Sequence, residues 1–147
     1  MNRLLVAAVI SSAVLMSSCA DAGGSACEPR VEQGWVRLVP GGMPMHAGFG
    51  RIANQCDAPA VVTGARSPSY GSIELHETRN VDGMMQMRQI KELRIAAKDA
   101  ATMKPGGLHL MLMEPKAPLK AGDRVTIVFT LAGGGEVTSE FAVRDPD

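Results

Sequence analysis

The chain has 147 residues, enough for one domain of ordinary size with one hydrophobic core. Its 15 basic and 15 acidic side chains give a formal net charge of zero, and like charges form no run. This balance argues against a nucleic acid or an anionic membrane surface as the main partner.

Residues 1–18 have the pattern of a secretory signal. Arg3 precedes an apolar stretch over residues 4–16, and small residues follow. An apolar core of about a dozen residues is too short to span a bilayer as a mature helix. We therefore expect an exported protein in which residues 19–30 form a tether and residues 31–147 form the folded domain.

Residues 15–19 resemble the lipobox of bacterial lipoproteins, in which cleavage before a cysteine is followed by lipidation of that cysteine. Leucine normally lies three residues before the cysteine, where this chain has Met16. Cleavage after Ala20, which would leave a soluble protein, is the alternative. We predict a periplasmic lipoprotein that is attached to the membrane only through a lipid on Cys19.

Two further cysteines, Cys27 and Cys56, remain as an even pair once Cys19 is set aside. Exported proteins meet an oxidising compartment, so we predict a disulfide between them. A loop of that size contributes roughly 3 to 4 kcal/mol on the chain-entropy model. Two buried free thiols are the alternative.

Short β-type segments separated by turn residues follow the tether, and nothing has the pattern of a long amphipathic helix. In the clearest pair, apolar residues alternate over residues 124–131, and Gly133, Gly134 and Gly135 reverse the chain into residues 136–143. The other expected strands are residues 34–39, 47–54, 60–67, 72–79, 84–90 and 108–113. Eight short strands predict an all-β fold, an antiparallel Greek-key barrel or sandwich, with no second domain.

Methionine is the compositional anomaly, with ten in the chain and six between Met84 and Met113. In a core with only five aromatic residues, gap filling is the ordinary explanation for any one of them. The spacing of the methionines relative to the histidines suggests a role beyond packing. A hairpin with the four-residue loop 80–83 would place His76 directly opposite Met87, with Cβ atoms roughly 4.5 to 5.5 Å apart. A two-residue turn on Asp82 and Gly83 would break this pairing.

A second pair lies on the strand expected over residues 108–113. There His109, Met111 and Met113 point one way, and the intervening leucines point the other way, toward the core. Two neutral imidazoles and two thioethers form a soft, uncharged donor set. Such a set favours Cu(I) over zinc, magnesium, calcium or Cu(II), and it lacks the thiolate that would slow release of the ion. The pattern therefore predicts one Cu(I) ion held for transfer.

The spacing His76, ten residues, Met87, twenty-one residues, His109, one residue, Met111 resembles that of the PCuAC family of periplasmic copper chaperones. Residues 73–78, 84–88 and 104–113 around these positions are also similar to that family. The resemblance runs from about residue 35 to residue 143. The chain ends without the His/Met-rich tail of some relatives, which argues against a second copper site of that kind.

The resemblance implies a cupredoxin-like barrel that binds Cu(I) through His76, Met87, His109 and Met111. It also implies delivery of copper toward the CuA centre of cytochrome oxidase, directly to the copper subunit or with a Sco-type thiol protein. We expect a monomer. The residues themselves do not indicate the delivery role.

Several residues near this pattern have more ordinary interpretations. His46 is expected to be a surface histidine, with a peripheral copper ligand as the alternative. Met85 and Met113 are expected to pack over the site, although either would also suit access of the ion. Glu74 and Glu77 are interpreted as a solvated face. Trp35 is assigned to the core.

Competing functions lack the residues that they require. A blue-copper protein needs a cysteine thiolate, and no cysteine follows Cys56. His76-Glu77 is not followed by the second histidine of H-E-x-x-H, and there is no G-x-S-x-G, so we do not expect an enzyme. The main alternative is an interaction lipoprotein whose methionines dock a partner rather than a metal.

Overall fold

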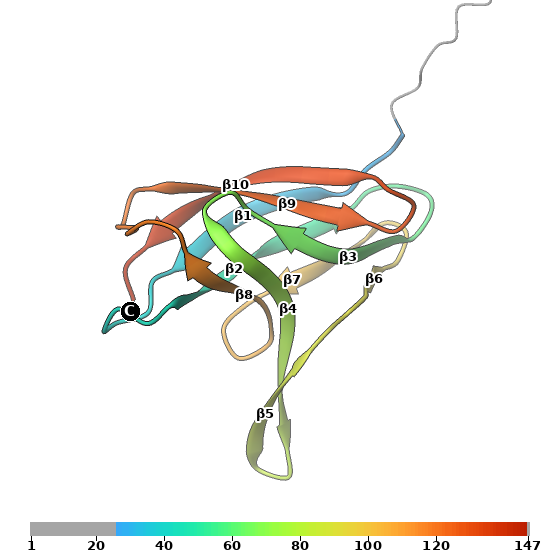
Figure 1. Cartoon of the computed structure of the whole chain (residues 1–147). Coiled ribbons are helices and arrows are strands. Elements are labelled where there is room, and N and C mark those ends of the chain that lie inside the picture. Colours follow the sequence, from blue (N-terminus) through green and yellow to red (C-terminus); the bar gives the residue numbers. More distant parts are fainter. Residues whose placement is uncertain (1–25, 147) are drawn as a thin grey trace, which may run out of the picture.

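The computed structural model describes residues 26–146, which form ten β-strands (Figure 1). The strands are β1 (Arg30–Arg37), β2 (Met45–Asn54), β3 (Ala60–Arg66), β4 (Tyr70–Val81), β5 (Met84–Gln89), β6 (Leu93–Ile95), β7 (Asp99–Met103), β8 (Leu108–Pro115), β9 (Arg124–Leu131) and β10 (Glu136–Arg144). Within these residues no helix is long and apolar enough to cross a membrane.

Seven of these strands close into a barrel in the order β4, β8, β2, β1, β10, β9 and β3. Pairing of Ala65 in β3 with Ile73 in β4 completes the ring. The predicted all-β, cupredoxin-like barrel is therefore confirmed, with one difference. β1 and β10 run parallel, so the barrel is mixed rather than wholly antiparallel. A parallel pair needs a long connection, and here nearly the whole domain forms it.

The barrel core follows from period-two alternation along the strands. Leu110 and Leu112 of β8 are fully buried, as the sequence pattern predicted, and so are Val125 and Ile127 of β9. Their neighbours in sequence point to the outside of the barrel. This alternation decides which side chains of β8 are left for a ligand.

Two short strands were not predicted. β6 and β7 lie at the edges of the barrel, where β6 pairs with β3 and β7 pairs with β2. Met103 ends β7 and is only 2% exposed, so this methionine belongs to the core. Both strands contain too few alternating apolar residues to give a strand pattern.

A disulfide joins Cys27, just before β1, to Cys56, just after β2. The free-thiol alternative therefore does not apply to this structure. Cys19, the signal sequence and most of the tether lie outside the described residues, so lipidation remains a prediction.

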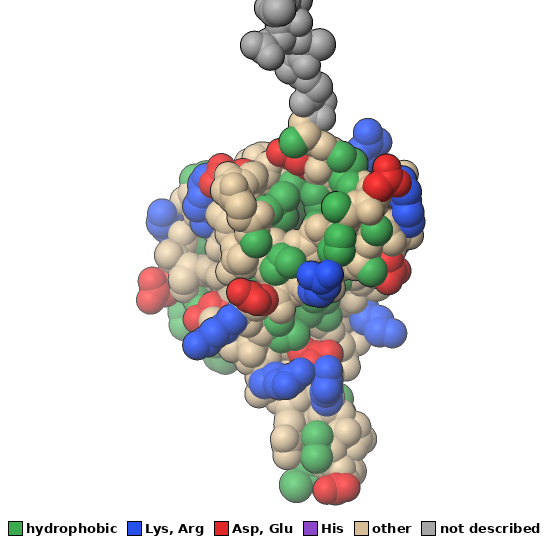
Figure 2. All heavy atoms as spheres, turned by 90° about the vertical axis from the view of Figure 1, so that its right-hand side faces the viewer, with side chains coloured by type: hydrophobic (Ala, Val, Ile, Leu, Met, Phe, Trp, Pro, Cys, Tyr) green, Lys and Arg blue, Asp and Glu red, His purple; other side chains and the backbone are tan. Residues whose placement is uncertain are grey.

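The β4–β5 hairpin projects from the barrel (Figure 1), because β5 pairs only with the outer half of β4. Its large apolar side chains are exposed: Met84 by 64%, Met85 by 61%, Met87 by 55% and Val81 by 40%. Figure 2 shows apolar side chains next to an acidic one at the tip of this projection, and further charged side chains near its base. The hairpin therefore presents thioethers to solvent.

Candidate metal centre

Two histidines from neighbouring strands lie directly opposite each other on the outer face of the barrel. His76 of β4 pairs with His109 of β8. Their ring centroids are 6.0 Å apart, and the ring planes are inclined by 47°. His109 is only 7% exposed, whereas His76 is partly exposed. Two imidazoles thus meet at a surface that solvent reaches from one side.

Met111 lies on the same face, two residues beyond His109 in β8. It pairs with Ala47 of β2 on one side and with Glu74 of β4 on the other. Its side chain is half-buried. The strand therefore directs His109 and Met111 outward while its leucines fill the core, as alternation predicted.

The predicted register of the β4–β5 hairpin is wrong. Val81 pairs with Met84, so the turn contains only Asp82 and Gly83, and His76 lies opposite Gln89 rather than Met87. Asp82 and Gly83 have positive φ angles of 54° and 83°, which a two-residue hairpin turn requires and which Asp-Gly readily adopts. The preference of Asp-Gly for a two-residue turn therefore replaces the predicted four-residue loop.

Met87 nevertheless stays on the face of the two histidines. It pairs with Thr78, two residues from His76, and a shift of two residues preserves the side on which a strand residue points. Diagonal neighbours of this kind have Cα atoms about 7–8 Å apart, within reach of a long side chain. The structure therefore brings the four predicted donors to one face of the barrel, with Met87 as the outermost. This face, with His76, Met87, His109 and Met111, is called the donor face.

Among the described residues, hydrogen bonding engages only one ring nitrogen of His109. Its Nδ1 lies 2.9 Å from the carbonyl oxygen of Gly107. A carbonyl oxygen only accepts, so Nδ1 carries the proton and donates it. The Nε2 lone pair of the neutral ring is then available to a metal.

His76 has the opposite arrangement. Its Nε2 lies 2.8 Å from Oε2 of Glu74, so the ring donates Nε2–H to that carboxylate. Its buried Nδ1 has no hydrogen-bond partner among the described residues. Buried polar atoms are nearly always paired, so this nitrogen marks a position where a ligand fits.

Glu74, expected on a solvated face, does lie on the outer face with its side chain 36% accessible, but it also contacts His76. A carboxylate that accepts the second N–H of a metal-binding imidazole fixes the tautomer and orientation of the ring. Glu74 lies two residues before His76 on the same face of β4. Alternation along the strand was the signal in the sequence that pointed to this contact.

Glu77 points away from the donors and belongs to an ion-pair cluster. Its Oε2 lies 2.7 Å from Nε of Arg79 and 3.1 Å from Nη2 of Arg88. The hydrogen bond from Arg79, followed by that from Arg88, lowers the pKa of Glu77. The charge of Glu77 is therefore neutralised outside the donor face. Glu74 is the carboxylate that contacts a residue of the donor face, His76.

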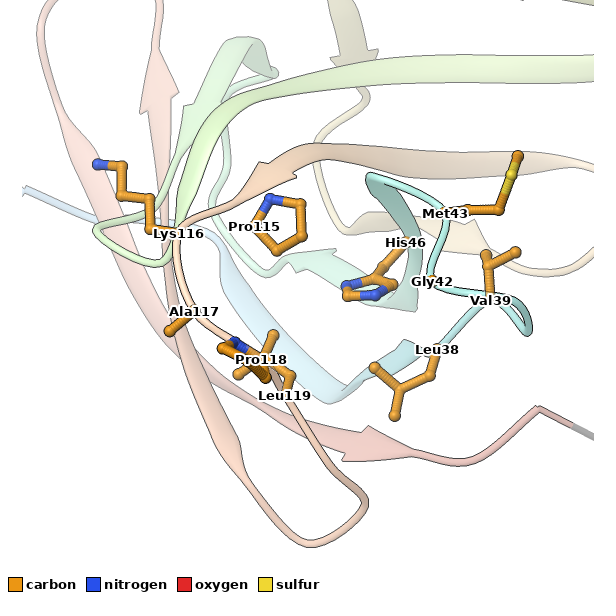
Figure 3. A pocket seen from close by; sticks show the side chains of 10 residues that line it. All are labelled: Leu38, Val39, Gly42, Met43, His46, Pro115, Lys116, Ala117, Pro118 and Leu119. Carbon is orange, nitrogen blue, oxygen red and sulfur yellow. The ribbon is translucent and has the colours of Figure 1, made fainter.

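His46 is neither a surface residue nor part of the donor face. It pairs with Leu112, on the core side of β2, and its Nδ1 lies 2.9 Å from the hydroxyl oxygen of Tyr70. Burial lowers the pKa of His46. The ring lines a cavity of about 520 Å³ together with Leu38 and Met43 (Figure 3). None of the four donors lines that cavity.

Trp35, assigned to the core from the sequence, instead packs on the outside of the barrel. Its ring centroid lies 4.7 Å from that of Phe49, and the guanidinium of Arg144 lies 4.8 Å from its centre. Phe49 in turn lies 6.5 Å from the His109 ring. These aromatic rings form an apolar side wall next to the imidazoles.

Within residues 26–146, no three His, Cys, Asp or Glu side chains gather as a metal site. The donor face therefore relies on thioethers beside its two imidazoles. A cupredoxin-like barrel with this outward His/Met set defines a PCuAC-type protein. The chain belongs to the LpqE-like family, since the family model described as "Putative lipoprotein LpqE-like" matches residues 30–143.

Two relatives extend this assignment. The "Putative lipoprotein Lxx21020" of Leifsonia xyli subsp. xyli (strain CTCB07) is 33% identical, covering 98% of this chain and 92% of that protein. The "Uncharacterized protein RP573" of Rickettsia prowazekii (strain Madrid E) is 31% identical, covering 66% of this chain and 56% of that protein.

Solved structures share the fold. The solution structure of CuI-DR1885 from Deinococcus radiodurans has a TM-score of 0.65 at 30% identity, covering 84% of this chain and 83% of that chain. The copper-bound PCuAC domain from PmoF2 has a TM-score of 0.65 at 22% identity, covering 79% of this chain and 92% of that chain. The predicted membership of the PCuAC family is confirmed.

Proposed function

We propose that this protein is an exported metallochaperone that binds one Cu(I) ion and passes it to another protein. The ligands are Nδ1 of His76, Nε2 of His109 and the sulfurs of Met87 and Met111. The observation that carries the proposal is the buried Nδ1 of His76, which has no partner within residues 26–146, beside the His109 imidazole, whose Nδ1 is held by the Gly107 carbonyl. Copper is the cargo here.

The donor set selects the ion. Thioether sulfur is a poor ligand for zinc, magnesium and calcium but a good one for Cu(I), and Cu(II) prefers tetragonal nitrogen and oxygen ligands. The copper-bound state of DR1885, which is 30% identical, supports the same cargo in this chain. Glu74 supplies the carboxylate that orients His76 and offsets the charge of the ion.

The same set suits release. All four ligands are neutral, so an acceptor that offers thiolates binds Cu(I) more strongly and draws the ion away. The proposed acceptors are a Sco-type thiol protein or the copper subunit of cytochrome oxidase, with delivery toward its CuA centre. The exposed position of Met87, 55% accessible on the projecting hairpin, makes it the ligand that an acceptor displaces first.

A matched pair of methionines on β5 tests the ligand assignment. Met87 lies on the donor face, whereas Met84, similarly exposed, lies on the other face of the same strand. Met87→Leu is expected to lower the Cu(I) affinity by about tenfold or more in an anaerobic titration against a competing chelator, and Met84→Leu to leave it unchanged. Equal affinities of both variants and the wild type would remove Met87 from the site.

The exposed apolar tip of the hairpin, formed by Val81, Met84 and Met85, favours a second candidate function, a lipoprotein that docks a partner without metal. Replacing both histidines by alanine separates the two. The chaperone function requires a large loss of Cu(I) affinity in that variant. If the affinity is unchanged, the docking function takes its place.

A further inference from the structure

We infer that Met45, Met111 and Met113 form a second Cu(I) position next to the His/Met site, to which the ion moves before it is released. The inference rests on the proposed function, and Met111 is the ligand that both positions share. One ion occupies one position at a time, because a single Met111 serves both.

Strand pairing brings these three thioethers together. Met45 of β2 lies directly opposite Met113 of β8. The amide of Glu114 donates to the carbonyl of Pro44 over 2.9 Å, which makes Met45 and Met113 a non-hydrogen-bonded pair. Such pairs have the closest side chains in an antiparallel sheet, with Cα atoms about 4.5 Å apart.

Met111 extends this pair along β8 on the same outer face. It lies two residues before Met113, so the two side chains are about 6.6 Å apart along the strand. Its partner in β2 is Ala47, whose methyl group leaves room above the strands. All three methionines are half-buried, so packing limits their motion while part of each residue remains exposed to solvent.

The surroundings of the three sulfurs are nearly neutral. Ser72 lies opposite Met113, and Glu74 lies opposite Met111, so the nearest charge on β4 is a carboxylate. On β1, Arg37 pairs with Ala47, but its guanidinium lies 5.2 Å from the centre of the Phe49 ring. These surroundings suit a monovalent soft ion. They offer soft donors and one adjacent negative charge, and the nearby Arg37 cation is engaged by the Phe49 ring.

Continuity with the His/Met site gives this position its role. Met111 holds the ion in both places, so the ion exchanges His76, His109 and Met87 for Met45 and Met113 without entering water. No redox or covalent step is involved, because coordinate bonds to neutral ligands are exchanged. Without a nitrogen ligand, the second position binds more weakly and favours release.

Variants that remove the histidines expose the second position. In His76→Ala/His109→Ala, Cu(I) binding is expected to weaken by more than about 100-fold but to persist, with only sulfur neighbours in X-ray absorption. Adding Met45→Leu and Met113→Leu, which conserve side-chain volume, is expected to abolish the residual binding. Adding Met84→Leu instead, on the other face of β5 from Met87, is the control and is expected to leave it intact.

The outcomes separate this inference from the proposed function. No loss of affinity on removing the histidines contradicts the proposed function. Loss followed by no residual binding, or residual binding that survives Met45→Leu and Met113→Leu, overturns the second position alone. Near-UV circular dichroism of each variant checks that the barrel is folded.

A kinetic measurement on the protein with both histidines covers the case in which the histidine variant does not fold. Met45→Leu/Met113→Leu is expected to bind Cu(I) as tightly as the wild type but to release it to a chelator about tenfold more slowly, a barrier difference of about 1.4 kcal/mol. An unchanged release rate would overturn the second position.

Discussion

His76 and His109 face each other across the β4–β8 pairing with ring centroids 6.0 Å apart, and in the described part of the chain each has one ring nitrogen engaged and one without a partner. This relationship connects two segments that are distant in the sequence. The contacts of His76 Nε2 with Glu74 and of His109 Nδ1 with Gly107 leave the other nitrogen of each ring for the proposed Cu(I) ion.

Removal of either histidine is expected to weaken Cu(I) binding. His76→Ala and His109→Ala should each lower the affinity by more than about 100-fold, since even loss of a partner outside the ligand shell costs 10–100-fold. Anaerobic competition with a Cu(I) chelator measures this. His46→Gln, on the core side of β2, is the control and should retain the affinity.

Glu74 and Glu77 provide a matched test of the carboxylate that orients His76. Glu74→Gln should reduce Cu(I) affinity by about 10–100-fold, because the amide holds the Nε2–H less firmly. Glu77→Gln removes an exposed ion-pair cluster with Arg79 and Arg88 and should leave the affinity unchanged. The same chelator competition applies. Equal effects of the two substitutions would contradict the role of Glu74.

Tyr70 is the only tyrosine in the chain, so its ionisation is directly visible in the ultraviolet spectrum. Burial raises its pKa from 10.0 to about 12. Because the folded state favours the neutral phenol, its contribution to stability is complete below pH 10 and is lost as the pH rises toward 12.

Spectrophotometric titration should therefore give a tyrosinate midpoint near 12 in the folded protein and near 10 in the urea-unfolded protein. A folded-state midpoint near 10 would contradict the buried position of Tyr70 against His46.

The Cys27–Cys56 disulfide closes a loop with a sequence separation of 29 residues. Replacing both cysteines by serine should lower the free energy of unfolding by roughly 3 to 4 kcal/mol, measured by urea denaturation. Cu(I) affinity should be retained, because the donors lie on β4, β5 and β8. Equal stability of the variant and the wild type would show that the bridge does not constrain the unfolded chain.

Local pattern in the sequence predicted much of the fold. The β9–β10 hairpin follows the expected alternation around Gly133 and Gly134, with Glu136 paired with Thr130. The same alternation correctly assigned the leucines of β8 to the core. These features depend only on residues close in sequence, where the two-residue period is strongest.

Local sequence patterns did not predict the features that depend on which strands pair. The parallel β1–β10 pair and the direct opposition of His76 and His109 arise from contacts between distant segments, which local patterns do not encode. The predicted register of Met87 was wrong, because the prediction gave more weight to a His76–Met87 pair than to the turn. Asp82-Gly83 prefers a two-residue turn. Met87 kept its face because the error was an even number of residues.

The most direct test of the central claim is X-ray absorption on the Cu(I)-loaded wild-type protein under anaerobic conditions, at one equivalent of copper. Four donors on one face predict two nitrogen and two sulfur neighbours, and a stoichiometry of one. Neighbours that include no nitrogen, or only nitrogen and oxygen, would contradict the site formed by His76, Met87, His109 and Met111.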